Sequence, residues 1–169
     1  MANKVYITEK GKQILERKIA EQAIRVKEIQ EEKSIAYTAS GDGWHDNPGY
    51  NQLIQLEERA ISELKAMEKR LSDSILWSSK ERNTEKVQIG SIVRYKLTNI
   101  KTGKVLENIF EIVGSGESDL KNKQISYDSP IGNAIWEMSE GCEVEVMLPA
   151  GLSKIEIVRL YKDWTEVPK

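Results

Sequence analysis

Apolar positions in the first half of the chain recur at alternating intervals of four and three residues, which indicates an amphipathic helix with a coiled-coil seam. The seam follows Thr8, a good N-cap residue, and continues without a proline to about Ser40. Its positions hold Leu15, Ile19, Gln22, Val26, Ile29, Lys33 and Ala36. The pattern predicts a helix of about 32 residues, roughly 48 Å long at 1.5 Å per residue.

A second stripe of the same kind runs from about Tyr50 to Ile75, with Glu57 as an interruption. Its apolar members are Leu53, Leu56, Ala60, Ile61, Leu64, Met67 and Leu71. The break between the two stripes is rich in glycine and contains Pro48. Two amphipathic helices joined by a tight turn bury their stripes most simply against each other. We therefore expect an antiparallel two-helix coiled coil over residues 1–78, with its tip at residues 40–50.

The pattern changes to β-branched runs with period two from Val87 onward, after a polar linker at residues 79–86. Strands are predicted at residues 91–99, 105–113, 125–127, 143–148 and 153–161. The pair Ser129-Pro130 predicts an N-cap and first turn of a short helix that reaches about Met138. We expect a twisted antiparallel sheet with one helix over residues 87–169, and hence an α+β fold.

Charge and composition restrict the class of protein. The chain of 169 residues has 25 Lys+Arg and 27 Asp+Glu, split 12 against 13 in residues 1–78 and 13 against 14 in the remainder. Neither half is a polycationic arm, which argues against binding naked nucleic acid by bulk charge. A single cysteine, Cys142, excludes an internal disulfide, and a single His45 excludes a Cys/His zinc cluster. With no signal-peptide core and no run of 18 apolar residues, we expect a cytoplasmic protein without a membrane partner.

The tip contains two carboxylates, Asp42 and Asp46, whose role has two interpretations. Asp42 between two glycines is a natural turn residue, and Asn47 before Pro48 is a natural N-cap for the second helix. Alternatively, the two carboxylates share a divalent cation with a partner, because Mg²⁺ often uses only one or two protein carboxylates. Both interpretations remain open and are compatible.

Several motifs resemble those of the bacterial Gre transcription elongation factors, and they span essentially the whole chain. The opening Ile7-Thr-Glu-Lys-Gly-Lys-Gln-Ile-Leu15 is similar to the start of that family. Gly41-Asp42 followed by Asp46-Asn-Pro-Gly-Tyr50 is similar to its tip signature, Gly-Asp-x-x-Glu-Asn-Ala-Glu-Tyr. The C-terminal domain of the family resembles three further segments: Ile112-Val-Gly-Ser-Gly-Glu-Ser-Asp119, Ile125-Ser-Tyr-Asp-Ser-Pro-Ile-Gly-Asn-Ala134 and Gly141-Cys-Glu-Val-Glu-Val146.

The resemblance implies a monomeric factor that binds RNA polymerase and is not an enzyme alone. An FKBP-like C-terminal domain would dock on the polymerase through Ser129, Pro130, Ile131 and Gly132. The coiled coil would enter the secondary channel and meet the RNA 3′ end only inside the complex. There Asp42 and Asp46 would hold Mg²⁺ shared with the polymerase, whose own active site cuts backtracked RNA. Three further residues would shape the tip, namely Gly41, Asn47 and Tyr50.

The tip departs from the family signature by one extra residue, most simply Gly43, and by Asp46 in place of Glu. Pro48-Gly49 replaces Ala-Glu, and Trp44 and His45 add bulk. A second hypothesis is therefore a Gre-like regulator or inhibitor of the same channel that does not stimulate cleavage. A third, prolyl isomerisation, is suggested only by the FKBP-like fold of the second half.

Overall fold

The computed structural model describes residues 5–41, 46–78 and 82–168. The chain divides into two compact units, one formed by Met1–Val5 with Lys12–Ser74 and the other by Tyr6–Gly11 with Ile75–Lys169. Tyr6 and Ile7 at the start of the chain, and the segment after Ser74, therefore belong with the second unit. The first is called the coiled-coil unit and the second the sheet unit.

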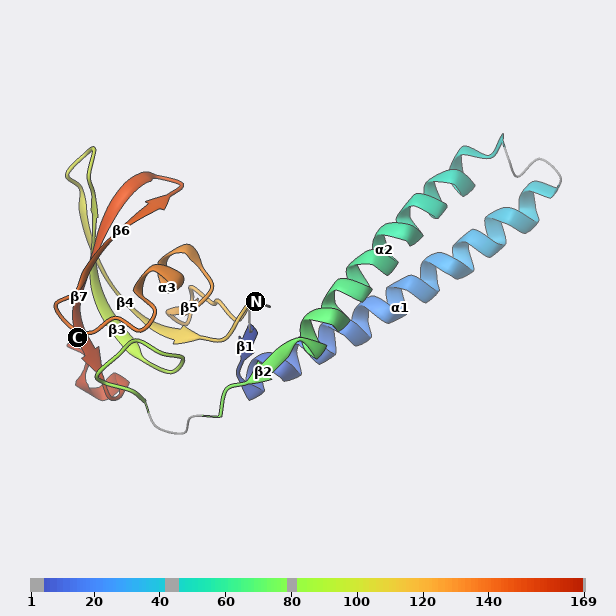
Figure 1. The fold of residues 1–169 in the computed structure, drawn as a ribbon. Coiled ribbons are helices and arrows are strands. Elements are labelled where there is room, and N and C mark those ends of the chain that lie inside the picture. The colour runs from blue at the N-terminus through green and yellow to red at the C-terminus, as the bar shows by residue number, and fades with distance from the viewer. Residues whose placement is uncertain (1–4, 42–45, 79–81, 169) are drawn as a thin grey trace. The chain divides into compact units, whose positions relative to one another are not determined.

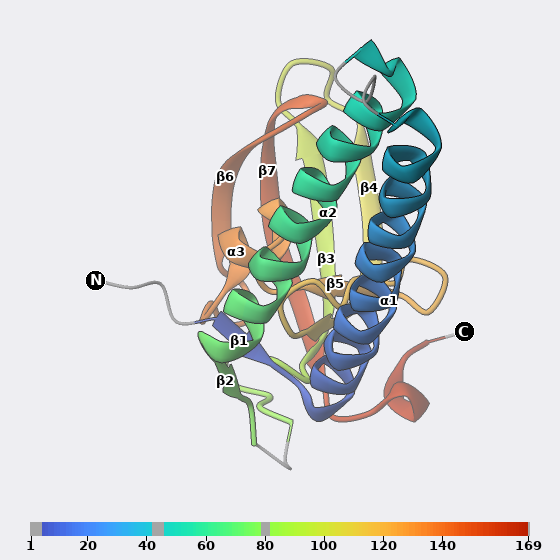
Figure 2. The same cartoon turned by 90° about the vertical axis from the view of Figure 1, so that its right-hand side faces the viewer.

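The coiled-coil unit contains α2 (Pro48–Ser72) and, from Lys12 onward, α1 (Glu9–Ser40), two helices that lie side by side (Figures 1 and 2). The first helix is confirmed at both ends. The second begins at Pro48 with Asn47 as its N-cap, as the Asn47-Pro48 pair predicts, two residues before the apolar stripe resumes at Tyr50. Three seam residues, Val26, Ile29 and Ala60, form the buried centre. The apolar side chains that pack against them are Leu53, Ile61 and Leu64.

Polar residues within the seam find partners on the opposite helix. The Gln22 side-chain amide donates to the Ala60 carbonyl at 3.1 Å. Lys33 forms an ion pair with Glu57, and Gln30 Nε2 donates to the same carboxylate at 3.0 Å. The hydrogen bond from Lys33 lowers the pKa of Glu57. Glu57, which interrupts the apolar stripe, is therefore a paired interhelical contact that favours one alignment of the helices.

The end of the second helix differs from the prediction. Residues Ser74–Leu76 form strand β2, hydrogen-bonded to β1 (Val5–Ile7), and the Trp77 N–H donates to the Ile7 carbonyl at 2.8 Å. The prediction that the second helix reaches Ile75 is therefore wrong for its last three residues, since α2 ends at Ser72. Ile75 continues the helical spacing of the sequence, but strand pairing determines its conformation.

The sheet unit contains a five-stranded sheet in the order β5-β4-β3-β7-β6. Its strands are β3 (Ile92–Asn99), β4 (Val105–Val113), β5 (Gln124–Ser126), β6 (Glu143–Leu148) and β7 (Gly151–Tyr161). The pairs β3–β4, β3–β7 and β6–β7 are antiparallel as predicted, whereas β5 runs parallel to β4. The expectation of a wholly antiparallel sheet is wrong at this strand, and the sheet is mixed.

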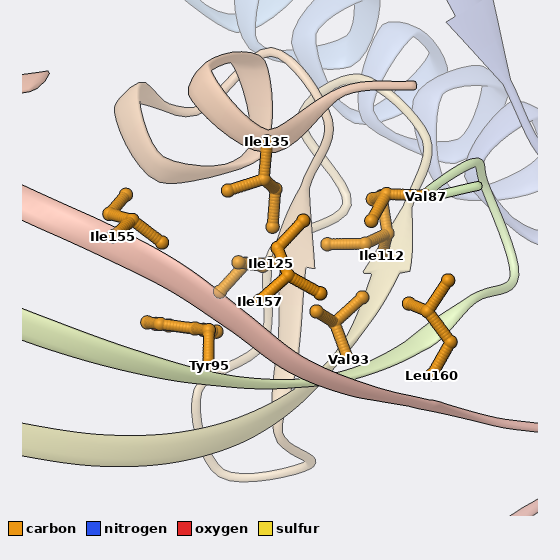
Figure 3. Close-up of a cluster of buried hydrophobic side chains, with 9 residues drawn as sticks. All are labelled: Val87, Val93, Tyr95, Ile112, Ile125, Ile135, Ile155, Ile157 and Leu160. Carbon is orange, nitrogen blue, oxygen red and sulfur yellow. The ribbon is translucent and has the colours of Figure 1, made fainter. Parts of the chain in front are cut away.

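A short helix, α3 (Pro130–Ile135), packs its apolar side on the sheet. It begins at the predicted residue but ends before Met138. Figure 3 shows Ile135 of α3 pointing toward side chains of β3 and β7. The buried cluster comprises Val87, Val93, Tyr95, Ile112, Ile125, Ile135, Ile155, Ile157 and Leu160. Burial raises the pKa of Tyr95 to about 12, so its phenol stays neutral in this core. The chain closes with a 3-10 turn at Trp164–Glu166.

Candidate functional site at the coiled-coil tip

The described part of the tip is built around Asn47, the N-cap of α2. Its Oδ1 accepts the backbone N–H groups of Gly49 at 2.9 Å and Tyr50 at 3.2 Å. These donors lie in the first helical turn, where no earlier carbonyl of the helix is available to them. On the other side, Gly41 leaves α1 with φ +54°, a conformation that favours glycine over other residues.

The two helices are also joined directly below the tip. Asn47 Nδ2 donates to Ser40 Oγ at 2.5 Å, and Ser40 Oγ donates to the Ala36 carbonyl at 2.7 Å. The rings of Tyr37 and Tyr50 lie 5.8 Å apart between centroids. Asn47 and Tyr50 were predicted from the tip motif, whereas Ser40 and Tyr37 belong to no motif and were not predicted as site residues. Their signal was only that they lie in the last turn of the predicted first helix.

Of the two predicted metal-assisting acids, the structure describes one. Asp46 is exposed and directly precedes Asn47. Asp42 lies outside the described residues, together with Gly43, Trp44 and His45. Within the described ranges, no three His, Cys, Asp or Glu side chains come together as a metal-binding group. An exposed carboxylate is nevertheless a hard oxygen donor, and one such donor fits a Mg²⁺ whose other ligands come from a partner.

The predicted docking residues lie in the sheet unit at the start of α3. Ser129 Oγ accepts the Gly132 N–H at 3.0 Å and so caps the helix. Gly132 is buried, and a Cβ atom there would lie 2.1 Å from the Ser126 carbonyl oxygen. Ile131 packs against the core, which leaves Pro130 as the exposed member of the group.

Next to these residues is an acid, Asp128, that was not predicted from the sequence as a site residue. Asp128 is exposed, and the hydroxyls of Ser115 and Ser126 both donate to its carboxylate. Both serines are buried, with 7% and 2% of their surface exposed. Because buried hydroxyls hold both oxygens, Asp128 presents a carboxylate with a fixed direction beside Ser129.

Comparison with known proteins gives the family. Residues 81–162 match the model for the C-terminal domain of transcription elongation factors GreA/GreB. The transcription elongation factor GreA of Alkaliphilus oremlandii is 32% identical over 81% of this chain and 82% of its own length. This chain belongs to the Gre family. A second GreA, from Syntrophomonas wolfei, is 30% identical over 94% of this chain and 96% of its own.

Among solved structures, GreA factor homolog 1 of Thermus thermophilus covers 94% of this chain and 99% of its own, with 21% identity and a TM-score of 0.43. In this Gre protein the structure brings Gly41, Asp46, Asn47 and Tyr50 together at one tip. The four residues that the sequence predicts for docking lie together in the other unit. Within the described residues of the Gre chain, no helix is both long and apolar enough to cross a bilayer.

Proposed function

We propose that this Gre protein binds RNA polymerase, inserts its coiled coil into the secondary channel and stimulates cleavage of backtracked RNA. The supporting observation is the pair of long helices ending in an exposed carboxylate, Asp46, beside a tip base held by Asn47. The cut is made by the active site of the polymerase, so the factor is an activator and not an enzyme by itself.

In this proposal the coiled coil serves to deliver the tip. The Lys33–Glu57 pair and the Gln22–Ala60 contact hold α1 and α2 in one alignment. The Asn47 cap fixes the first turn of α2 and with it the backbone position of Asp46. The Asp46 carboxylate then accepts a hydrogen bond from the attacking water and orients it.

The metal of this proposal is a Mg²⁺ ion shared with the polymerase, for which Asp46 and Asp42 would each supply carboxylate oxygen. When bound, such an ion stabilises the charge on the attacking and leaving oxygens of a phosphoryl displacement. The contribution of this chain is to place the carboxylates and the water. It binds no metal of its own in this scheme.

Docking is assigned to the start of α3. Pro130 offers an exposed apolar contact, while Ser129 and Gly132 hold the helix on the sheet. Ile131 anchors the same turn in the core. This division of roles predicts that Pro130 contacts the polymerase and that its three neighbours support it.

The decisive experiment adds the protein to stalled, backtracked transcription complexes with Mg²⁺ and measures the release of the RNA 3′ fragment. Wild type should increase the cleavage rate. With Asp46→Asn or Asp42→Asn, that increase should be smaller than with wild type by a factor of about ten or more. Glu28→Gln, an exposed acid in the middle of α1, serves as the control and should cleave like wild type. No increase with wild type, or an equal increase with the tip variants, would refute the proposal.

The altered tip favours a second candidate, a Gre-like regulator that occupies the channel without stimulating cleavage. Asp46 is shorter than the Glu of the family signature, and Pro48-Gly49 stands where that signature has Ala-Glu. This candidate predicts slower nucleotide addition by an active elongation complex and no cleavage of a backtracked one. Measuring both rates in the same preparation separates the two functions.

A further inference from the structure

Ser40, the last residue of α1, forms a bridge between the two helices at the base of the tip. Its Oγ donates to the Ala36 carbonyl at 2.7 Å and accepts from Asn47 Nδ2 at 2.5 Å. The same Asn47 amide accepts the Gly49 and Tyr50 N–H groups through Oδ1. One chain of hydrogen bonds therefore runs from the last turn of α1 to the first turn of α2.

A serine near the end of a helix commonly bonds to a carbonyl four residues earlier, and that bond alone would carry no meaning. Thr38 provides the comparison, because its hydroxyl donates to the Ser34 carbonyl at 2.9 Å on an exposed part of the same turn. What distinguishes Ser40 is the second bond, to a residue seven positions away on the other helix. Ser40 is also half-buried, whereas Thr38 is exposed.

The bridge closes the base of a connection that is one residue longer than the Gre tip signature. A longer connection gives its end residues more conformational freedom. A hydrogen bond across the two ends removes part of that freedom for the residues next to it. Asp46 is bonded directly to Asn47, so the direction in which its carboxylate points depends on how firmly Asn47 is held.

We propose that Ser40 is a positioning residue that acts through Asn47 to aim the Asp46 carboxylate. The inference rests on the proposed function, because aiming matters only if Asp46 takes part in cleavage. It gives the longer tip a means of holding its acid that the family signature does not contain. Ser40 itself touches neither RNA nor metal in this scheme.

The first test measures cleavage of backtracked complexes at saturating factor. Ser40→Ala should lower the maximal cleavage rate roughly tenfold, because a displaced reacting group reacts more slowly. It should also raise the Mg²⁺ concentration needed for half-maximal rate, while affinity for the polymerase stays within about twofold of wild type. Ser40→Thr keeps the hydroxyl and should restore the rate, and Thr38→Ala should match wild type in every measurement.

The second test uses the free protein and does not depend on activity. The Gly49 and Tyr50 amide hydrogens should exchange with solvent about five times faster in Ser40→Ala than in wild type. In Thr38→Ala their exchange rates should equal those of wild type.

If wild type cleaves and Ser40→Ala cleaves equally well, the inference is overturned while the proposed function stands. If Ser40→Ala loses polymerase binding together with cleavage, Ser40 is a docking contact, which also overturns it. If wild type does not cleave, the proposed function fails. Amide exchange then decides whether Ser40 holds Asn47, and unchanged exchange overturns the inference.

Discussion

Glu117 holds Thr8 through two hydrogen bonds, although 109 residues separate them in the chain. The Thr8 N–H lies 2.8 Å from Oε1, and the Thr8 hydroxyl lies 2.5 Å from Oε2. The same hydroxyl accepts the Gly11 N–H at 3.1 Å and so caps α1. Two glycines make room for the carboxylate, since a Cβ atom at Gly11 or Gly114 would lie 2.0 Å from Oε1. The motif at the start of the chain and the motif at residues 112–119 therefore meet within the sheet unit.

We expect Gly114→Ala to destabilise this junction more than Gly11→Ala. The atoms nearest a Cβ at Gly11 belong to the Glu117 side chain, which can turn away at the loss of its bonds to Thr8, and alanine regains about 1 kcal/mol of helix propensity. A Cβ at Gly114 would also lie 2.9 Å from the Ile7 Cα, and backbone does not move easily. Gly114→Ala should therefore cost about 2 to 3 kcal/mol, against less than about 1 kcal/mol for Gly11→Ala. Urea unfolding measures both values, and equal losses would contradict the explanation.

Two substitutions at Asn47 separate its roles as a helix cap and as a bridge. Asn47→Ala removes both and should lower the free energy of unfolding by about 1 kcal/mol. Asn47→Asp keeps an acceptor for the Gly49 and Tyr50 N–H groups, favoured by the helix dipole, but loses the donor to Ser40. Its thermal stability should stay close to wild type while cleavage falls. Gln55→Ala, on the exposed face of α2, is the control for general effects of substitution. A loss of stability in Asn47→Asp as large as in Asn47→Ala would show that the two roles do not separate.

The helices were predictable from sequence because their signal is local. The seam spacing located α1 within one residue of each end, and Pro48 was expected in the first turn of α2. From the sequence alone, Glu57 is only a charged residue that interrupts the apolar stripe of the second helix. Only the alignment of the two helices reveals that Lys33 lies opposite it.

The features that the sequence did not reveal depend on contacts between distant segments. Strand β5 has three residues, too few to carry a directional signal, and its parallel pairing follows from how the chain returns after Val113. The end of α2 was overestimated because Ile75 fits the helical spacing, although strand pairing removes it from the helix. At the tip, motif matching identified Asp46 and Asn47. Ser40 carries no motif and becomes visible only through its hydrogen bond to Asn47.

Acid should weaken the coiled coil through Glu57. The hydrogen bond from Lys33 places the folded-state pKa of Glu57 below its ordinary value of 4.5. A carboxyl whose pKa is lowered on folding contributes stability that is present above the unfolded-state pKa and is lost as pH falls through the folded-state value. Unfolding by urea at several pH values from 7 to about 3 should show a steeper loss for wild type than for Glu57→Gln. The exposed neighbour Glu58 supplies the control, because Glu58→Gln should retain the pH dependence of wild type. Parallel curves for wild type and Glu57→Gln would remove Glu57 as the cause.

Gly132→Ala should damage the proposed docking surface by moving α3. The added Cβ would lie 2.1 Å from the Ser126 carbonyl oxygen and 2.9 Å from the Tyr127 Cα, both of which are backbone atoms beneath the helix. Relief requires α3 to lift from the sheet, which would pull Ile135 from the core, so we expect a loss of about 3 kcal/mol. Asn133→Ala, at the next and exposed position, should stay within about 0.5 kcal/mol of wild type.

Thermal unfolding checks the stability of both variants. Polymerase affinity, measured at a temperature where Gly132→Ala remains folded, checks the docking role. If α3 carries the contact, Gly132→Ala binds more weakly than Asn133→Ala, whereas equal affinities would place the docking surface elsewhere on the sheet unit.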